Sequence, residues 1–267
     1  MEKQRIVIKV GTSTLTYENG KLNIRRLERL CKVISDLQNM GNEMILVSSG
    51  AFGVGMGKLG IKERPTMTNK KQAIAAVGQC ELMFMYDKLF GEYNNVVAQI
   101  LLTKYAVETP HKEDTIRNAF MSLIDMGIIP VVNENDSVAT DELEGENFGD
   151  NDQLSAIVAK LIDADKLIIL TDIDGLYDKN PSLHSDAKKI DTVEHITDEI
   201  KAMAGGRGSN RGTGGMATKI LAAEIATEVG IDVQICAGDN PELIYDIFDN
   251  KAVGTVFLGK EKNNDSN

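Results

Sequence analysis

The sequence predicts an α/β fold, an αβα sandwich with a mostly parallel central sheet. Short runs rich in β-branched residues alternate with helix-forming segments along the chain, an order typical of parallel sheets with helices on both faces. Glycines and small polar residues gather directly after several of these runs, at the strand ends where such sheets bind ligands. We expect one domain over residues 1–259 and a polar tail over 260–267.

The periodicity of apolar residues places the individual elements. Buried strands are expected over residues 5–10, 43–47, 95–103, 128–133, 166–171, 231–237 and 254–258. Helices are expected over 24–37, 68–89, 109–126, 149–161 and 216–229, the first capped by Asn23 and ended by Gly41. Residues 11–14 are expected as a small-residue turn after a strand, 137–147 as a hairpin or loop, and 178–204 as loop-rich. Residues 48–55 form a second segment of small residues at a strand end.

The composition excludes several classes of protein. The chain has 267 residues, of which 42% are hydrophobic and 26% charged, as in an ordinary globular protein. Its net charge of −11 argues against nucleic-acid binding, so an anionic substrate must be bound by a few local lysines. No apolar run is long enough to cross a bilayer, and the first residues lack the apolar core of a signal peptide. We therefore expect a cytoplasmic protein.

The metal-binding residue types are sparse. Cys31, Cys80 and Cys236 lie far apart in apolar surroundings, which favours buried, inert thiols over a disulfide framework or a zinc site. The three histidines form no cluster with cysteine or glutamate in the sequence, so no transition metal held by the protein is expected.

A glycine-rich segment, Gly-Thr-Gly-Gly-Met-Ala-Thr-Lys over residues 212–219, precedes the last long helix. Its glycines let backbone N–H groups approach a ligand, and a helix start offers unpaired N–H groups and a positive dipole to an anion. Lys219 lies about one helical turn further along, where its ammonium can reach the same anion. The segment predicts a phosphate-binding loop, although it lacks the Gly-Lys-Ser/Thr ending of a Walker A loop. The ordinary alternative is a surface loop that caps a helix.

A lysine stands inside the first apolar strand. Burying Lys9 costs free energy unless an anionic group pairs with it. The ordinary alternative is a lysine near a strand end whose ammonium extends into solvent. The nearby Gly11 favours a functional role, because it opens a small-residue turn at the end of this strand.

Six ordered segments resemble the amino acid kinase family over residues 5–258. They are Ile-Lys-Val-Gly-Thr-Ser at 8–13, Val-Ser-Ser-Gly-Ala at 47–51, Asn-Glu-Asn-Asp at 133–136, Gly-Asp-Asn-Asp-Gln-Leu-Ser-Ala at 149–156, Thr-Asp-Ile-Asp-Gly-Leu-Tyr at 171–177, and the segment 212–219. The third and fourth are similar to family members that act on glutamate. Many of those carry a C-terminal domain similar to RNA-modification modules. This chain ends just after its last predicted strand, which suggests the short form.

The resemblance implies ATP-dependent phosphorylation of the side-chain carboxylate of L-glutamate to L-glutamyl 5-phosphate, the first step of proline biosynthesis. Lys9 and Lys219 are implied as catalytic lysines that offset charge on the transferred phosphoryl group, and Asp152 as the carboxylate that orients both. The acceptor carboxylate is already ionised at neutral pH, so no general base is needed. Mg²⁺ is expected through ATP phosphates, without a protein metal site, and the acidic segment 141–146 as a solvated loop.

The resemblance assigns further residues to the two substrates. Asp136 is implied as the partner of the α-ammonium of glutamate. The groups implied for its α-carboxylate are Ser49, the Gly50 and Ala51 amides, Asn133 and Asn151. ATP is implied to bind Lys9, Gly11, Thr171, Asp172, Thr213, Gly214, Gly215, Met216, Ala217, Thr218 and Lys219. The earlier part of the chain would then lie mainly on the substrate side and the later part on the nucleotide side. The ordinary alternatives are turn residues for Asn133 and Asp136, and a helix cap for Asp152.

Two other functions stay open from the sequence. The first is a related kinase acting on aspartate, N-acetylglutamate, carbamate or UMP. The segments around Ser49 and Asp136 offer no basic residue for a nucleotide phosphate, and an acetylated substrate would not need Asp136. The second is a non-catalytic ligand sensor, although Lys9, Lys219 and Asp152 are all present. The resemblance also implies a homodimer or homotetramer, and proline as a feedback inhibitor that shares the α-amino and α-carboxylate groups of glutamate.

Overall fold

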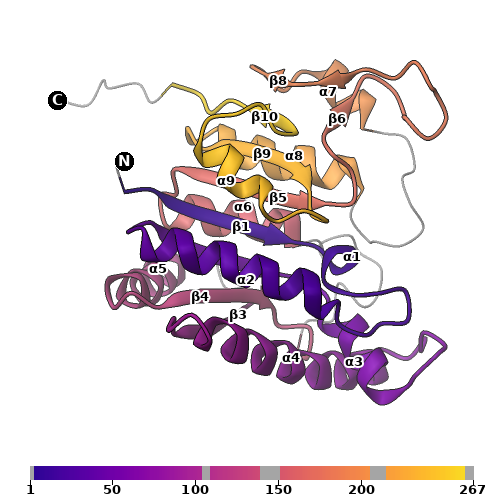
Figure 1. The fold of residues 1–267 in the computed structure, drawn as a ribbon, viewed down its shortest axis with the longest axis vertical. Helices are drawn as coiled ribbons and strands as arrows, with labels where there is room; N and C mark the ends of the chain where they lie inside the picture. Colours follow the sequence, from indigo (N-terminus) through magenta and orange to yellow (C-terminus); the bar gives the residue numbers. More distant parts are fainter. Residues whose placement is uncertain (1–2, 104–108, 139–150, 205–214, 262–267) are drawn as a thin grey trace.

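The computed structural model describes residues 3–103, 109–138, 151–204 and 215–261, and these form an αβα sandwich (Figure 1). A sheet of eight strands has the order β3-β4-β2-β1-β5-β9-β10-β8. Neighbouring strands from β3 to β9 pair in parallel, whereas β10 is antiparallel to β9. The predicted α/β architecture with a mostly parallel sheet is confirmed.

The elements follow the predicted order. The sheet consists of β1 (Arg5–Val10), β2 (Glu43–Ser48), β3 (Val97–Leu102), β4 (Ile129–Glu134), β5 (Lys166–Thr171), β8 (Thr192–Val193), β9 (Asp232–Ala237) and β10 (Thr255–Phe257). A small antiparallel pair consists of β6 (Leu176–Tyr177) and β7 (Lys189–Ile190). The helices are α1 (Thr12–Leu15), α2 (Ile24–Asn39), α3 (Ala51–Leu59), α4 (Thr68–Gly91), α5 (Pro110–Asp125), α6 (Asn151–Leu161), α7 (Asp198–Met203), α8 (Met216–Thr227) and α9 (Leu243–Phe248).

The central strand β1 sends alternate side chains into two separate cores. Ile6, Ile8 and Val10 pack with α2, α4 and α9 on one face, and Val7 packs with α5, α6 and α8 on the other. Because side chains alternate along a strand, Lys9 shares the side of Val7. Its side chain therefore points into the layer that contains α6 and α8.

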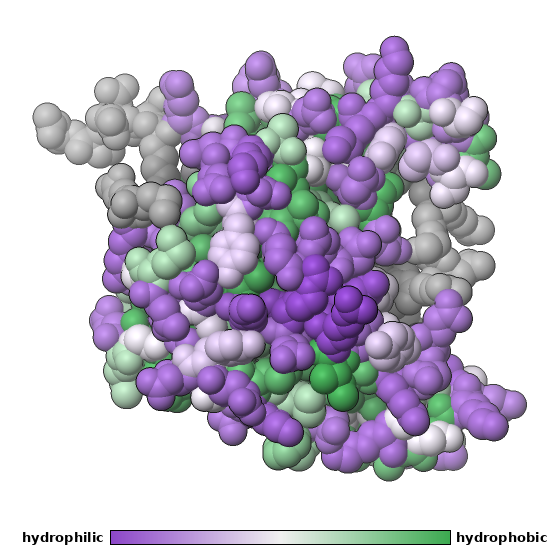
Figure 2. Space-filling model, viewed as in Figure 1, coloured by the Kyte–Doolittle hydropathy of each residue, from purple (hydrophilic) through white to green (hydrophobic). Residues whose placement is uncertain are grey.

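Helix α2 is amphipathic, with an apolar side that packs against the sheet and a polar side toward solvent. Its buried side includes Leu27, Leu30 and Ile34, and Asn23 caps it by accepting a hydrogen bond from the backbone N–H of Arg26. Hydrophilic side chains predominate on the molecular face that carries this helix (Figure 2). Within the described residues, no helix is both long and apolar enough to span a membrane.

The connections leave β1 in opposite directions, and this creates a place for a site. From β1 the chain first adds β2 on one side, and later adds β5 on the other side. Parallel sheets bind ligands where their connections diverge, beyond the carboxyl ends of the strands. The strands β1, β2, β4 and β5 all end on this edge, next to the small and polar residues that the sequence places there.

Several local predictions are wrong. The segment expected as a small-residue turn after β1 contains a single helical turn, α1. The small-residue segment after β2 forms the longer α3, which was not expected as a helix and whose N-cap Gly50 has φ +98°. The helix α9 was not expected, whereas the region 178–204 is loop-rich as predicted and contains only the short β7, β8 and α7. Cys31 and Cys236 are buried as expected, but Cys80 is exposed. It lies on α4, where burial depends on which side of the helix meets the core.

Close packing of α3 against α4 explains why a glycine-rich segment is helical. A Cβ atom added at Gly78 would overlap the backbone carbonyl oxygen of Ala51, and one added at Gly55 would overlap the carbonyl oxygen of Ile74. The glycines let the two helix backbones approach each other directly. Since Ala51 is the first residue of α3, this contact also fixes the start of that helix.

Gly78→Ala is therefore expected to lower the free energy of unfolding by about 3 kcal/mol, because the backbones must separate to admit the methyl group. Urea unfolding at neutral pH would measure this. Gly91→Ala is the matched control: Gly91 ends α4, nothing lies within 4 Å of an added Cβ, and its conformation is not left-handed. The control variant should be as stable as the parent or slightly more stable. Equal stability of Gly78→Ala and Gly91→Ala would contradict the close helix contact.

Candidate active site

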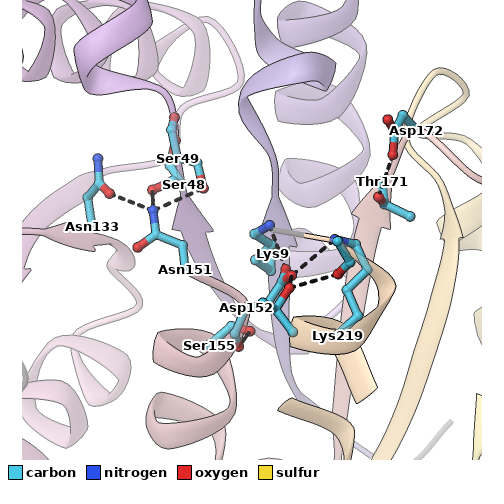
Figure 3. A network of polar contacts seen from close by, with 12 residues as sticks. Lys9, Ser48, Ser49, Asn133, Asn151, Asp152, Ser155, Thr171, Asp172 and Lys219 are labelled. Carbon is cyan, nitrogen blue, oxygen red and sulfur yellow. Dashed lines mark hydrogen bonds and ion pairs between the residues drawn. The ribbon is translucent and has the colours of Figure 1, made fainter. Parts of the chain in front are cut away.

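Two lysines and one aspartate from three elements meet beside the carboxyl end of β1 (Figure 3). The ammonium nitrogen of Lys9 lies 2.6 Å from Oδ1 of Asp152, and that of Lys219 lies 3.0 Å from Oδ2. Lys9 comes from β1, Asp152 from the first turn of α6 and Lys219 from the start of α8. All three are buried, with exposed fractions of 4%, 0% and 5%. The structure thus brings together the three residues expected to be catalytic.

The two ammonium groups keep Asp152 ionised despite its burial. Burial acts to raise the pKa of this carboxyl group, but the charges of Lys9 and Lys219 and their hydrogen bonds outweigh it and hold the pKa well below its usual value. Taken together, the two lysines and one aspartate carry one net positive charge. In a chain with a net charge of −11, this is a local site suited to an anion.

The start of α8 is joined to the same carboxylate. The hydroxyl oxygen of Thr218 lies 3.0 Å from Oδ2 of Asp152 and 2.8 Å from the carbonyl oxygen of Gly215. Gly215 is the exposed N-cap of α8, and Met216 and Ala217 follow it in the first turn. The first backbone N–H groups of a helix have no acceptor within the helix itself, and such a helix start can bind an anion. The predicted ATP ligands Thr213 and Gly214 lie outside the described residues.

A group of amides and hydroxyls lies on one side of these charged residues (Figure 3). The side-chain nitrogen of Asn151 lies 2.9 Å from Oγ of Ser49, 2.9 Å from Oδ1 of Asn133 and 3.0 Å from the carbonyl oxygen of Ser48. The sequence prediction placed Ser49, Asn133 and Asn151 on one ligand, and the structure brings them together. Gly50 and Ala51 begin α3 directly after Ser49.

Two further predicted residues lie just beyond the ends of their strands. Asp136 is half-buried, just beyond β4. Gly11 follows β1, and a Cβ atom added to it would lie 3.7 Å from the ammonium nitrogen of Lys9. A glycine at this position therefore leaves space beside that ammonium group.

The end of β5 lies on the other side of the lysines in the same view (Figure 3). The hydroxyl of Thr171 donates a hydrogen bond of 3.0 Å to Oδ1 of Asp172. Lys9, Asp152 and Lys219 thus lie between Asn151 with its partners and this strand end, in the arrangement expected if one substrate binds on each side.

Residues outside the predicted set of ligands hold the site through hydrogen bonds. Gln79 on α4 accepts a hydrogen bond of 2.7 Å from the side-chain amide of Asn133. The hydroxyls of Ser48 and Tyr86 share a buried hydrogen bond of 2.8 Å, and burial raises the pKa of Tyr86. The hydroxyl of Ser155 donates to the carbonyl oxygen of Asp152 at 2.6 Å. No local pattern indicated Gln79 or Tyr86, because the distribution of apolar residues along α4 does not show which side of the helix faces the core.

The described residues contain no group of three or more histidine, cysteine, aspartate or glutamate side chains placed to hold a metal ion. The acidic segment 141–146 lies outside the described residues. The groups around Lys9 and Lys219 are instead donors suited to phosphate oxygens.

The chain is similar to known proteins over most of its length. The pattern described as "Amino acid kinase family" matches residues 4–237. A protein named glutamate 5-kinase from Clostridium perfringens is 54% identical, over 97% of this chain and 97% of its own length. Another of that name from Listeria innocua is 52% identical over 97% of this chain and 94% of its own length.

Solved structures with the same fold are more distant in sequence. A UMP kinase from Bacillus anthracis aligns with a TM-score of 0.66 at 18% identity, covering 96% of both chains. A UMP kinase from Ureaplasma parvum aligns with a TM-score of 0.62 at 16% identity, covering 97% of this chain and 100% of that one. At this identity the likeness concerns the fold alone. The family pattern and the two close relatives, by contrast, cover most of the sequence, and the chain therefore belongs to the amino acid kinase family, within the sequence group of these glutamate 5-kinases.

Proposed function

We propose that this chain transfers the γ-phosphoryl group of ATP to the side-chain carboxylate of L-glutamate, giving L-glutamyl 5-phosphate and ADP, the first step of proline biosynthesis. The observation that carries the proposal is the buried arrangement in which Asp152 holds Lys9 on one carboxylate oxygen and Lys219 on the other. The relatives of this chain that are named glutamate 5-kinase support glutamate as the acceptor.

The reaction needs little covalent help from the protein. An oxygen of the glutamate side chain attacks the γ-phosphorus, a new O–P bond forms, and the bond to the ADP oxygen breaks with its electron pair. The attacking carboxylate is ionised at neutral pH, so no proton has to be removed from it. The three histidines His111, His184 and His195 are all exposed, in agreement with a site that works without one.

The two lysines would act on the charge of the transferred group. In a loose transition state, negative charge spreads over the γ-phosphoryl oxygens and the leaving oxygen. An ammonium group has three N–H donors, so it can bind Asp152 and a phosphate oxygen at the same time. Holding both lysines on one buried carboxylate fixes their positions before ATP binds, and preorganised charge of this kind stabilises a transition state strongly.

Each substrate would occupy one side of the lysines. We place glutamate against Ser49, the Gly50 and Ala51 amides, Asn133 and Asn151, with its α-ammonium near Asp136. We place ATP against Gly11, Thr171, Asp172 and the start of α8, including Gly215 and Thr218. Mg²⁺ bound to ATP would neutralise phosphate charge, a role that phosphate oxygens and waters can support without a cluster of protein carboxylates.

An assay of ADP release with a panel of acceptors tests the proposal. L-Glutamate should support turnover and yield a hydroxamate when hydroxylamine traps the acyl phosphate. L-Aspartate, N-acetyl-L-glutamate, carbamate and UMP should support far less. A hydroxamate from N-acetylglutamate but not from glutamate would contradict the proposed substrate. Binding of glutamate without ADP release would instead indicate a ligand sensor.

The same assay with added proline tests regulation. We propose that proline competes with glutamate, because both carry a protonated α-nitrogen, primary in glutamate and secondary in proline, beside an α-carboxylate. We also propose a cytoplasmic homodimer or homotetramer in which residues 1–259 act as one kinase domain. Unchanged rates at saturating proline would exclude the competition.

A further inference from the structure

We propose that Gln79 is a positioning residue for the acceptor site, which fixes the side-chain amide of Asn133 and, through it, that of Asn151. The inference rests on the proposed function and extends it to a residue on α4, behind the side chains that would contact glutamate. It follows from a chain of hydrogen bonds in which each amide leaves the next amide only one orientation.

The first link is set by the backbone. The side-chain nitrogen of Asn151 lies 3.0 Å from the carbonyl oxygen of Ser48, which can only accept. Asn151 must therefore present its NH₂ group toward β2. Its remaining donor is then directed to Ser49 and Asn133, whose oxygens lie 2.9 Å away.

The second link is set in the same way. Oδ1 of Asn133 lies 2.9 Å from the backbone N–H of Glu134, which can only donate, and 2.9 Å from the NH₂ group of Asn151. Both neighbours require an oxygen there. The NH₂ group of Asn133 must then face the opposite direction, where Oε1 of Gln79 accepts its hydrogen bond at 2.7 Å.

One polar atom in this series of hydrogen bonds has no partner among the described residues. Oδ1 of Asn151 is buried and has no hydrogen-bond partner among the residues that the structure describes. A buried amide oxygen without a donor is costly, and such atoms are uncommon in folded proteins. A bound substrate with an ammonium group would supply the donor. The hydrogen bonds on the nitrogen side of Asn151 thus direct its oxygen to a ligand.

Gln79 is held firmly enough to perform this role. It directly follows Gly78, the residue at which α4 meets the backbone of Ala51 and Gly55. The contact that fixes α4 therefore also fixes the start of α3, where Gly50 and Ala51 lie. One helix pair sets the position of the predicted α-carboxylate donors and of the glutamine that orients Asn133.

Loss of the Gln79 acceptor would disturb glutamate binding and leave ATP binding intact. Asn133 is 2% exposed, so its NH₂ group cannot turn to water if Oε1 is removed. The amide must rotate to find another acceptor, and its oxygen then leaves Asn151. Gln79→Met keeps a side chain of similar length without the acceptor, and should raise KM for glutamate about tenfold. KM for ATP should stay within about twofold of the parent value.

The experiment compares steady-state kinetics of the parent with Gln79→Met, Gln79→Ala and Gln72→Met, and repeats Gln79→Met in an Asn133→Ala background. Gln72 is a half-buried glutamine on the same helix and serves as the matched control. Its variant should retain both KM values. If Gln79 acts through Asn133, Gln79→Met should change KM for glutamate less than about twofold once Asn133 is absent.

Three results would overturn the inference. One is an unchanged KM for glutamate in both Gln79→Met and Gln79→Ala. Another is a parallel rise in KM for ATP, which would indicate a general structural defect. The third is a full effect of Gln79→Met in the Asn133→Ala background. If the parent enzyme does not phosphorylate glutamate at all, the proposed function fails and this inference fails with it, whereas an active parent with unaffected Gln79 variants excludes the inference alone.

Discussion

Replacing either Lys9 or Lys219 with methionine is expected to lower kcat by about 10²–10³-fold. Methionine nearly matches lysine in length and removes only the charge and its N–H donors, so the buried space stays filled. If the ammonium groups stabilise charge that develops on the transferred phosphoryl group, KM for glutamate should change much less than kcat. Steady-state ADP release at saturating glutamate and MgATP gives both constants.

The double variant Lys9→Met/Lys219→Met is the sharper measurement. Both ammonium groups bind the same carboxylate, at 2.6 Å and 3.0 Å, so loss of one lysine also disturbs the position of the other. Residues that act as one unit have effects that do not add. We expect the double variant to be little slower than the slower single variant, not slower by the product of both factors.

The control for these variants is an exposed lysine in an ordinary ion pair. Lys251 pairs with Asp246 at 2.7 Å and with Asp249 at 3.1 Å, and its side chain is 58% exposed. Lys251→Met should leave kcat within about twofold, since exposed ion pairs contribute little. Near-parental turnover of Lys219→Met would show that the role assigned to this lysine is wrong.

Sequence reasoning predicted the parts of the site that lie at strand ends and failed on parts that depend on helix packing. Lys9 stood out because a charge inside an apolar strand needs a partner, and Asp152 is that partner. Ser49 directly follows β2 and Asn133 lies near the end of β4, and parallel strands end on the same edge of the sheet. Only the signal for Lys9 is local, whereas Ser49, Asn133 and Asp152 were assigned through the motifs shared with the amino acid kinase family.

Gln79 shows what local signals cannot reveal. Apolar and polar residues are spread around all sides of helix α4, so its sequence does not indicate which residues face the site. The side of α4 that faces the site is set by Gly55 and Gly78, which let the backbones of α3 and α4 touch. The same contact makes a glycine-rich segment helical where propensity alone favours a turn. Tertiary packing here outweighs local preference, and helix facing emerges only with the fold.

Asp152→Asn is expected to lower the free energy of unfolding by about 3–5 kcal/mol at pH 7, because it leaves two buried ammonium groups without their shared carboxylate. Lys9 and Lys219 hold the pKa of Asp152 below its usual value. The stability that this carboxylate provides is therefore complete above its unfolded pKa of about 3.9 and is lost as the pH falls through the lower folded pKa. Urea unfolding of both proteins at pH 7, 5 and 3 measures the difference.

The comparison of the two proteins isolates this one group from general acid unfolding. Every other carboxyl group titrates in both, so the stability difference changes only where Asp152 binds a proton. We expect the same difference at pH 7 and pH 5 and a smaller one at pH 3. Asp246→Asn removes one of the two partners of Lys251, in a pair with side chains 58% and 37% exposed, and should cost less than about 1 kcal/mol at pH 7. A difference for Asp152→Asn that is as small as this control, or that stays constant down to pH 3, would mean that Asp152 does not hold the two lysines as a buried ion pair, and the preorganised charge on which the proposed mechanism depends would be absent.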